Sequence, residues 1–255
     1  MRKVPEVTIF FWIVKILTTA AGESTSDFLV HIMNPVVAVL LGGIVFVVAL
    51  ALQFRARKYN AWIYWLAVSM VAVFGTMAAD VLHIGLGIPY LYSTIFFAVA
   101  LALVFWLWYT VEKTLSIHSI TSTRREMFYW LTVVTTFALG TAAGDMTAIT
   151  LDLGYLPSGI LFGALILLIA CVHYLAVVFL RVEHRHQSRN AVLAFWLAYI
   201  LTRPFGASFA DWMGKAQSVG GLGWGDGTVS IILALLIVCF VGYLAVSKVD
   251  VERAG

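Results

Sequence analysis

One short pattern occurs four times along the 255 residues and constrains the fold more than any other feature. In each copy an aromatic residue is followed by a tryptophan, nine further residues, a glycine, four residues and an aspartate. The copies occupy residues 11–27, 64–80, 129–145 and 195–211, all without a gap. Self-similarity of this kind indicates one supersecondary unit that is repeated along the chain. The sequence therefore predicts four copies of one unit.

The composition places these units in a membrane. Hydrophobic residues make up 62% of the chain and charged residues only 11%, whereas soluble domains have roughly 45–50% and about 25%. Each of the apolar runs is long enough, at about 18–24 residues, to cross a bilayer as a helix. We therefore predict an all-α integral membrane protein with a single membrane domain over residues 1–255. The eight predicted transmembrane helices cover residues 8–30, 35–53, 61–84, 90–111, 127–150, 157–180, 191–213 and 228–247.

The helices are predicted to form four tandem helical hairpins around an axis along the membrane normal. The first helix of each hairpin carries the repeated pattern and should line the axis, with the second helix outside it. Small residues let membrane helices approach closely, so the glycines of the pattern are predicted to lie at helix contacts. The hairpins cover residues 8–53, 61–111, 127–180 and 191–247, and their glycines are Gly22, Gly75, Gly140 and Gly206.

The distribution of lysine and arginine predicts the orientation. Basic residues gather at both chain ends and in the linkers between hairpins, whereas Lys215 alone lies toward the opposite side. Because cytoplasmic loops carry the excess of positive charge, both termini should face the cytoplasm. The net charge of +3 is explained in this way and does not indicate nucleic-acid binding. The tryptophans of the pattern would then form an aromatic girdle near the inner interface.

Intramembrane charges supply the functional prediction. A charged side chain at the bilayer centre costs on the order of 2.5–3.5 kcal/mol or more, so such residues should face protein or water. The internal cations Lys15 and Arg203 do not balance the acids, which favours a bound cation or protons on some carboxylates. Each cation either forms an ion pair, with Glu23 or with an aspartate of another repeat, or acts as a tethered cation that substrate displaces. The predicted cation or proton site comprises Glu23, Asp27, Asp80, Asp145 and Asp211.

Oxygen and imidazole groups near these acids extend the candidate site. Hydroxyls such as Thr76 and Thr141 lie one residue after a repeat glycine, and His31 and His83 follow two of the aspartates. Carboxylate, hydroxyl and imidazole groups together can replace the hydration shell of a metal ion. In the alternative interpretation, each aspartate bonds the amides of its own turn and the histidines pack in the core.

The four motifs at residues 15–27, 75–80, 139–145 and 202–212 also carry a family likeness. Through these motifs the chain resembles a bacterial family of membrane-anchored proteins of uncharacterised function. Members of this family have GxxxxD motifs in their transmembrane hairpins. The likeness spans essentially the full length. It implies a multi-pass protein of the bacterial inner membrane and the recurrence of the acidic positions, but no activity.

The leading functional hypothesis is a proton-linked cation transporter, with a divalent metal such as Mn²⁺ as a candidate substrate. Its partners would be the lipid bilayer and the carried cation, with no cofactor beyond a bound metal; the sequence leaves the oligomeric state open. One alternative is a non-transporting scaffold or sensor whose acids are structural. Another is an intramembrane enzyme that uses the acids as general acid and base. We rank the enzyme last because the sequence contains no P-loop, GxSxG, HExxH or zinc-deaminase pattern.

Overall fold

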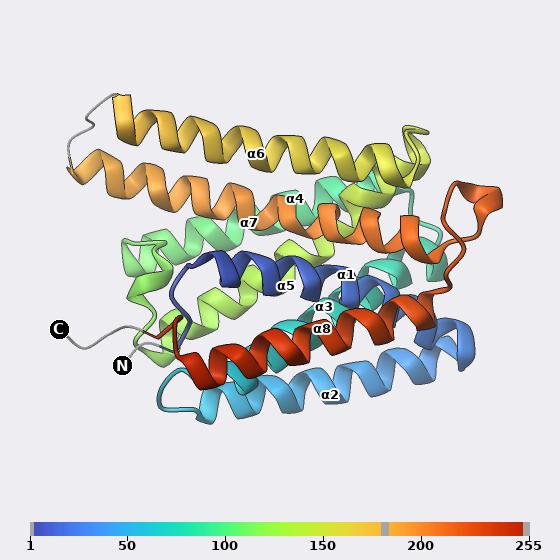
Figure 1. Cartoon of the computed structure of the whole chain (residues 1–255), viewed down its shortest axis with the longest axis horizontal. Helices are drawn as coiled ribbons and strands as arrows, with labels where there is room; N and C mark the ends of the chain where they lie inside the picture. Colours follow the sequence, from blue (N-terminus) through green and yellow to red (C-terminus); the bar gives the residue numbers. More distant parts are fainter. Residues whose placement is uncertain (1–2, 180–183, 252–255) are drawn as a thin grey trace.

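The computed structural model describes residues 3–179 and 184–251, and over these ranges it contains eight α-helices and no strand (Figure 1). The helices run side by side along the longest dimension of the molecule. The predicted all-α fold is therefore confirmed. The helices are α1 (Ile9–Ile32), α2 (Pro35–Arg55), α3 (Ala61–Asp80), α4 (Tyr90–Glu112), α5 (Thr123–Asp145), α6 (Tyr155–Phe179), α7 (His184–Gly214) and α8 (Asp226–Ser247).

Local sequence signals explain where several helices begin. The side chains of Thr8, Asn34, Asn60 and Ser122 each accept a hydrogen bond from a backbone amide in the first turn. Such N-caps satisfy donors that have no partner within the helix. Pro35 occupies the first position of α2, where its missing N–H is not needed. These caps mark where α1, α2, α3 and α5 begin.

Seven helices, α2 to α8, are long and apolar enough to cross a membrane, so the chain has the character of a multi-pass membrane protein. Within the described ranges, α1 is the exception to the predicted set of eight. It has 24 residues, but Lys15, Glu23, Asp27 and several hydroxyls interrupt its apolar character. Most of these polar side chains are buried against other helices. The surrounding helices thus cover most of the polar side chains of α1.

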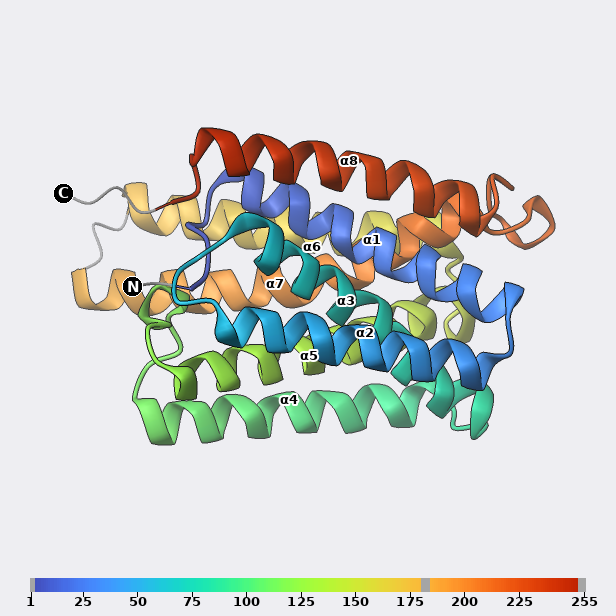
Figure 2. The ribbon, with the colours of Figure 1, turned by 90° about the horizontal axis from the view of Figure 1, so that it is seen from below.

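The helices that carry the repeated pattern form a closed inner ring. α1 contacts α3, α3 contacts α5, α5 contacts α7, and α7 returns to α1. α2 and α6 lie on opposite sides of this ring in Figure 1, and α8 and α4 on opposite sides in the perpendicular view of Figure 2. In the apolar core of each span, 44–61% of the residues of α3, α5 and α7 are buried, against 6–28% for the peripheral helices. The expected arrangement of inner and outer helices is therefore observed.

The packing partner of each outer helix differs from the expectation of self-contained hairpins. The outer helices α2, α4 and α6 make their most extensive contacts with the inner helix of the following repeat, namely α3, α5 and α7. The last outer helix, α8, packs on α1 of the first repeat more extensively than on α7. Each outer helix thus covers the groove beside the next inner helix, and this offset joins neighbouring repeats.

The two ends of the bundle differ in their contacts. At one end, here called the terminal end, the chain ends meet, because the Glu6 amide donates to the carbonyl of Asp250 at 2.8 Å. Lys3 there forms a 2.6 Å ion pair with the buried Glu126. The opposite end, the turn end, contains the connections within each repeat.

Part of the basic charge used to predict orientation, including Arg2, Arg181 and Arg253, lies outside the described residues.

Candidate functional site

Side chains from the four inner helices form five layers along the axis of the ring. Successive layers lie four residues apart on every helix, because residues i and i+4 share a helix face. All but four of these twenty residues are at most 5% exposed, and the exceptions are partly buried. From the terminal end to the turn end, we name the layers the aromatic layer (Phe11, Tyr64, Tyr129, Phe195), the lysine layer (Lys15, Val68, Val133, Tyr199), the arginine layer (Thr19, Ala72, Phe137, Arg203), the glutamate layer (Glu23, Thr76, Thr141, Ala207) and the aspartate layer (Asp27, Asp80, Asp145, Asp211).

The repeat glycines hold these layers together. Each one contacts the arginine-layer residue of the next inner helix, and the fourth glycine contacts that of α1. A Cβ added to Gly22 would lie 2.8 Å from the carbonyl carbon of Ala72, and one added to Gly75 would lie 2.8 Å from Cβ of Phe137. Gly140 makes room for the side chain of Arg203 in the same way, and Gly206 for Thr19. The ring therefore closes through four equivalent contacts.

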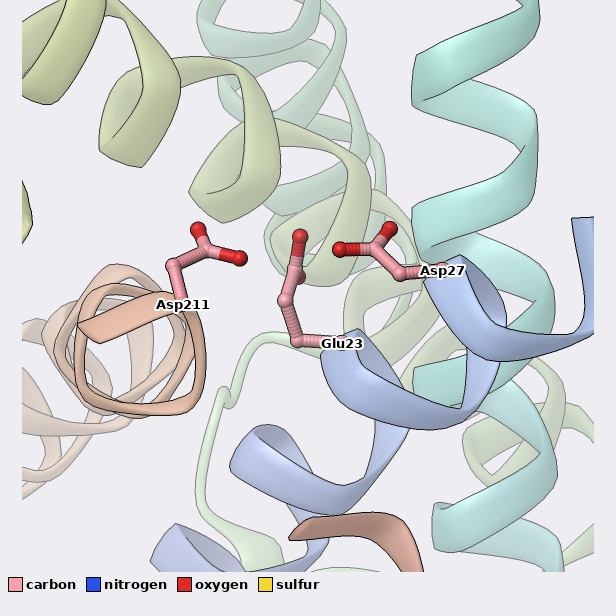
Figure 3. A group of neighbouring side chains, drawn as sticks. All are labelled: Glu23, Asp27 and Asp211. Atoms are coloured by element: carbon pink, nitrogen blue, oxygen red, sulfur yellow. The ribbon is translucent and has the colours of Figure 1, made fainter. Parts of the chain in front are cut away.

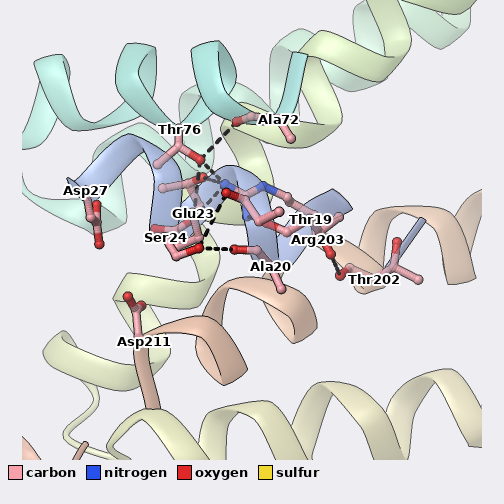
Figure 4. A network of polar contacts seen from close by, with 12 residues as sticks. Thr19, Ala20, Glu23, Ser24, Asp27, Ala72, Thr76, Thr202, Arg203 and Asp211 are labelled. Atoms are coloured by element: carbon pink, nitrogen blue, oxygen red, sulfur yellow. Dashed lines mark hydrogen bonds and ion pairs between the residues drawn. The ribbon is translucent and has the colours of Figure 1, made fainter. Parts of the chain in front are cut away.

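Arg203 joins all four inner helices through its guanidinium (Figure 4). Its Nη2 lies 2.6 Å from the Glu23 carboxylate of α1 and 2.7 Å from the Thr141 hydroxyl of α5, and it also donates to the Thr76 hydroxyl of α3. Its Nη1 donates to the carbonyl of Thr19 at 3.2 Å. Arg203 is fully buried and Glu23 is 3% exposed. The pair thus fills the centre of the arginine and glutamate layers.

Three carboxylates meet on the turn-end side of Arg203 (Figure 3). Glu23, Asp27 and Asp211 each offer an oxygen atom, and these oxygens all lie within 4.8 Å of one another. Glu23 and Asp27 are one turn apart on α1, whereas Asp211 comes from α7. We call this set the acid group.

Lys215, which follows α7, neutralises part of the acid group. Its ammonium forms an ion pair with Asp27 and lies 3.6 Å from Asp211 and 3.8 Å from Asp226. Burial by itself would lower the pKa of Lys215, but the Asp27 and Asp211 carboxylates outweigh burial and raise this pKa above its ordinary value. Lys215 therefore remains a cation across the physiological pH range.

Asp80 and Asp145 occupy the same layer, but they are not members of the acid group found among the described residues. Both are partly buried and lie within electrostatic range of Glu23 and Asp27. Each is followed by a π-helical turn, Val81–Gly85 or Met146–Thr150, which the first and fourth repeats replace with other turns. The structure therefore brings together three of the five predicted acids, those of the first and fourth repeats.

The remaining predicted residues have other surroundings. Lys15 lies two turns from Glu23 along α1, and no ion pair between it and an acid is found in the described part of the chain. Its Nζ lies 4.1 Å from the ring centre of Phe137. His83 bonds the carbonyl of Ile88 at 3.2 Å, and His31 is exposed. Neither histidine belongs to the acid group, because their side chains lie beyond the aspartate layer toward the turns.

These four units match a known repeat. The family model described as "Repeat of Unknown Function (DUF347)" matches residues 10–59, 63–114, 128–178 and 194–250. The chain belongs to this family. Each match covers one inner helix and the outer helix that follows it, so the internal repeats predicted from the sequence are confirmed. No curated protein and no solved structure matches the chain. A bacterial source and an inner-membrane location stay predictions.

The DUF347 repeats contain two features that sequence reasoning missed. Lys215 was placed on the opposite side from the other basic residues but given no partner, although its spacing of four from Asp211 indicates a helical ion pair. The tryptophans were expected at the lipid interface, but Trp65, Trp130 and Trp196 are 1–3% exposed and pack in the core. The aromatic layer and its tryptophans fill the terminal end of the axis instead.

Proposed function

We propose that this DUF347 protein is a membrane transporter that carries a cation in a proton-linked cycle. The four repeats would surround an axis along the membrane normal, with both termini in the cytoplasm and the acid group in the outer half of the bilayer. The apolar outer faces of α2, α4, α6 and α8 support insertion, and the basic linkers support this orientation.

The observation that carries the proposal is the convergence of Glu23, Asp27 and Asp211 in an otherwise apolar bundle. Among the residues that the structure describes, two cations, Arg203 and Lys215, face the five carboxylates of the glutamate and aspartate layers. Buried carboxylates that are not neutralised are costly, so a bound cation or protons must supply the remaining positive charge. Carboxylate oxygens suit a hard divalent ion such as Mn²⁺.

The two cations would have different roles in such a cycle. Lys215 lies beside the acid group on the loop after α7, and its side chain is 28% exposed. It can therefore leave Asp27 and Asp211 when an ion or protons take its place. Arg203 holds Glu23 and closes the axis toward the terminal end. An ion bound in the acid group would need this pair to open before it could move further.

Ion flux into proteoliposomes tests the proposal. In Asp27→Asn and Asp211→Asn we expect Mn²⁺ uptake and its accompanying proton movement to fall by at least about tenfold, the loss typical of weakened metal sites. Asp152→Asn is the matched control, because Asp152 is an exposed acid in a turn at the same end. Flux that is present in the wild type and unchanged in both acid variants would refute the proposal.

A second candidate is a non-transporting scaffold or sensor with structural acids. It is favoured by the hydrogen bonds of the two terminal guanidinium nitrogens of Arg203, which connect α7 to the other three inner helices as a structural contact would. Under this alternative, the wild type and the Asn variants bind no ion, and the variants only lose thermal stability. Ion binding measured by calorimetry on the wild type separates the two functions.

A further inference from the structure

Lys15 is buried at the centre of the bundle, and no acid in the described ranges forms an ion pair with it. It is 1% exposed, and among the described residues its Nζ has no hydrogen-bond partner. The Nζ lies over two rings, 4.1 Å from the centre of Phe137 on α5 and 4.4 Å from that of Tyr199 on α7. The equivalent positions in α3 and α5 are the buried valines Val68 and Val133. Packing at this level therefore does not require an amine.

Hydroxyl groups continue from Lys15 toward the terminal end. The Tyr199 hydroxyl is buried and has no hydrogen-bond partner in the described part of the chain. Tyr199 lies within electrostatic range of Tyr129, whose hydroxyl is hydrogen-bonded to that of Tyr64 in the aromatic layer. These protonatable groups lie beside a large cluster of buried aromatic and aliphatic side chains.

The series continues to the terminal end of the bundle. The rings of Tyr64 and Tyr59 are 5.7 Å apart, and the Tyr59 hydroxyl donates to the Asp250 carboxylate. Asp250 is 2% exposed, and its second carboxylate oxygen has no partner among the residues that the structure describes. Asp250 lies where the chain ends meet, so the series links the centre of the bundle to its terminal end.

The chemistry of these groups suggests a common use. An ammonium in an apolar interior is costly without an acceptor, and the rings of Phe137 and Tyr199 compensate only in part. Lysine can respond by releasing its proton, which arginine cannot do in a protein. The ionisable groups that face Lys15 are Tyr199 and Arg203 of α7, and α1 itself places Glu23 two turns away. Its layer partner on α3 is apolar.

We propose that Lys15, with Tyr199, Tyr129, Tyr64, Tyr59 and Asp250, forms the terminal-end half of the proton path. Lys15 would accept a proton from the turn-end side of the bundle when Arg203 moves, and would pass one on to the tyrosine hydroxyls. Each hydroxyl would accept one proton and donate another, so no net charge accumulates on the tyrosines, and Asp250 would receive the proton. This inference rests on the proposed function and names the groups that carry the coupled proton.

Substitutions at Lys15 separate a proton carrier from a structural cation. In Lys15→Met we expect proton movement in proteoliposomes to fall by at least about tenfold, while the unfolding temperature is unchanged or raised because a buried charge is replaced by an apolar chain of similar length. Lys15→Arg keeps the charge but cannot release a proton, so it should be as inactive as Lys15→Met. Proton movement restored in Lys15→Arg would overturn the inference.

The tyrosines provide an independent test with a matched control. Tyr129→Phe removes one hydroxyl of the Tyr64–Tyr129 pair and should slow proton movement, whereas Tyr92→Phe, at an exposed tyrosine of α4, should not. Thermal unfolding of both variants checks that the fold is retained. Equal proton movement in folded Tyr129→Phe and the wild type would contradict the path.

The failure of this inference is distinguishable from failure of the proposed function. Wild-type protein that moves no ion would refute the transporter, whereas normal proton coupling in Lys15→Met would refute only the path.

A measurement that does not depend on flux is the ¹⁵N spectrum of labelled lysine side chains, with Lys15→Arg to assign the signal. We expect the Lys15 Nζ to exchange between ammonium and amine forms while the protein stays folded. If the Lys15 signal is that of an ammonium at every pH at which the protein is folded, the inference is overturned.

Discussion

At the scale of single residues, Arg203 and Glu23 make the contact on which the centre of the molecule depends. They lie 180 positions apart in sequence, and their 2.6 Å ion pair is buried between α7 and α1. A buried ion pair contributes little net stability relative to apolar residues, but loss of one partner leaves an uncompensated charge in the interior. The loss of one partner should therefore lower the stability of the protein far more than the loss of both.

Glu23→Gln is expected to destabilise the protein by about 3–5 kcal/mol, because Arg203 is then left as a buried charge without a counter-ion. Chemical or thermal unfolding in detergent measures the change. The double variant Glu23→Gln with Arg203→Met should recover part of the loss, since no charge remains unpaired. A single variant as stable as the wild type would show that the ion pair does not hold the centre.

Lys215→Gln is expected to raise the affinity of the acid group for Mn²⁺, because the tethered ammonium no longer competes for Asp27 and Asp211. The pKa of Lys215 is raised in the folded state. Its ion pairs are therefore fully present below the ordinary lysine value of about 10.4 and are lost only as pH rises through the higher folded value. Calorimetric titration of both proteins with Mn²⁺ at pH 8 measures this gain. Weaker binding by the variant would contradict the competition.

At the scale of helices, the repeat glycine sets how closely neighbouring inner helices approach. Each glycine faces the next inner helix at one level, so the four contacts are equivalent around the ring. The side chains that fill the axis nevertheless differ from repeat to repeat: the arginine layer contains a threonine, an alanine, a phenylalanine and an arginine. The backbone is thus close to fourfold in its contacts, whereas the chemistry is not.

Gly22→Ala should destabilise the bundle by about 1–3 kcal/mol, the usual cost of overpacking. Its Cβ would lie 2.8 Å from the backbone carbonyl carbon of Ala72, which cannot move without shifting α3. Gly242→Ala on α8 is the control, because the nearest atom to its added Cβ is 3.8 Å away on Trp62. Unfolding temperatures in detergent compare the two. Equal tolerance would mean that the inner helices are not closely packed at this level.

At the scale of the whole molecule, the offset packing of outer helices closes the ring. Because α8 packs on α1 and α4 packs on α5, the first and second halves of the chain share extensive contacts. The inner helices also meet across the halves, at α3 with α5 and at α7 with α1. Neither half by itself buries the central charges, since Glu23 lies in one half and Arg203 in the other.

Two fragments, residues 1–114 and 115–255, should therefore associate when they are expressed together. An affinity tag on one fragment should recover the other in about equal amount, because extensive close helix packing connects the two halves. Arg203→Glu in the second fragment places two acids at the centre and should reduce recovery. Fragments that are stable and separate in detergent would show that each pair of repeats folds as an independent unit.

The local patterns of the sequence were sufficient to predict the secondary structure. Hydropathy and the repeat located the helices, since these signals act between residues close together in the chain. Sequence also placed the glycines on the inner helices and identified Arg203 as an internal charge with Glu23 as a candidate partner. The layer residues are spaced four apart in the sequence as well. The repeated glycine and aspartate do not by themselves indicate which of these residues face the axis.

Only the tertiary structure decided which charges meet. Repeats one and four are far apart in sequence, and ring closure brings Glu23, Asp27 and Asp211 together beside Lys215. Periodicity cannot choose among several acids at one depth, because that choice depends on the contacts between helices that close the ring. For the same reason the isolation of Lys15 among aromatic rings was not foreseen: its neighbours Phe137 and Tyr199 come from other repeats. The sequence by itself determined four repeated helix pairs; long-range packing determined what each buried charge faces.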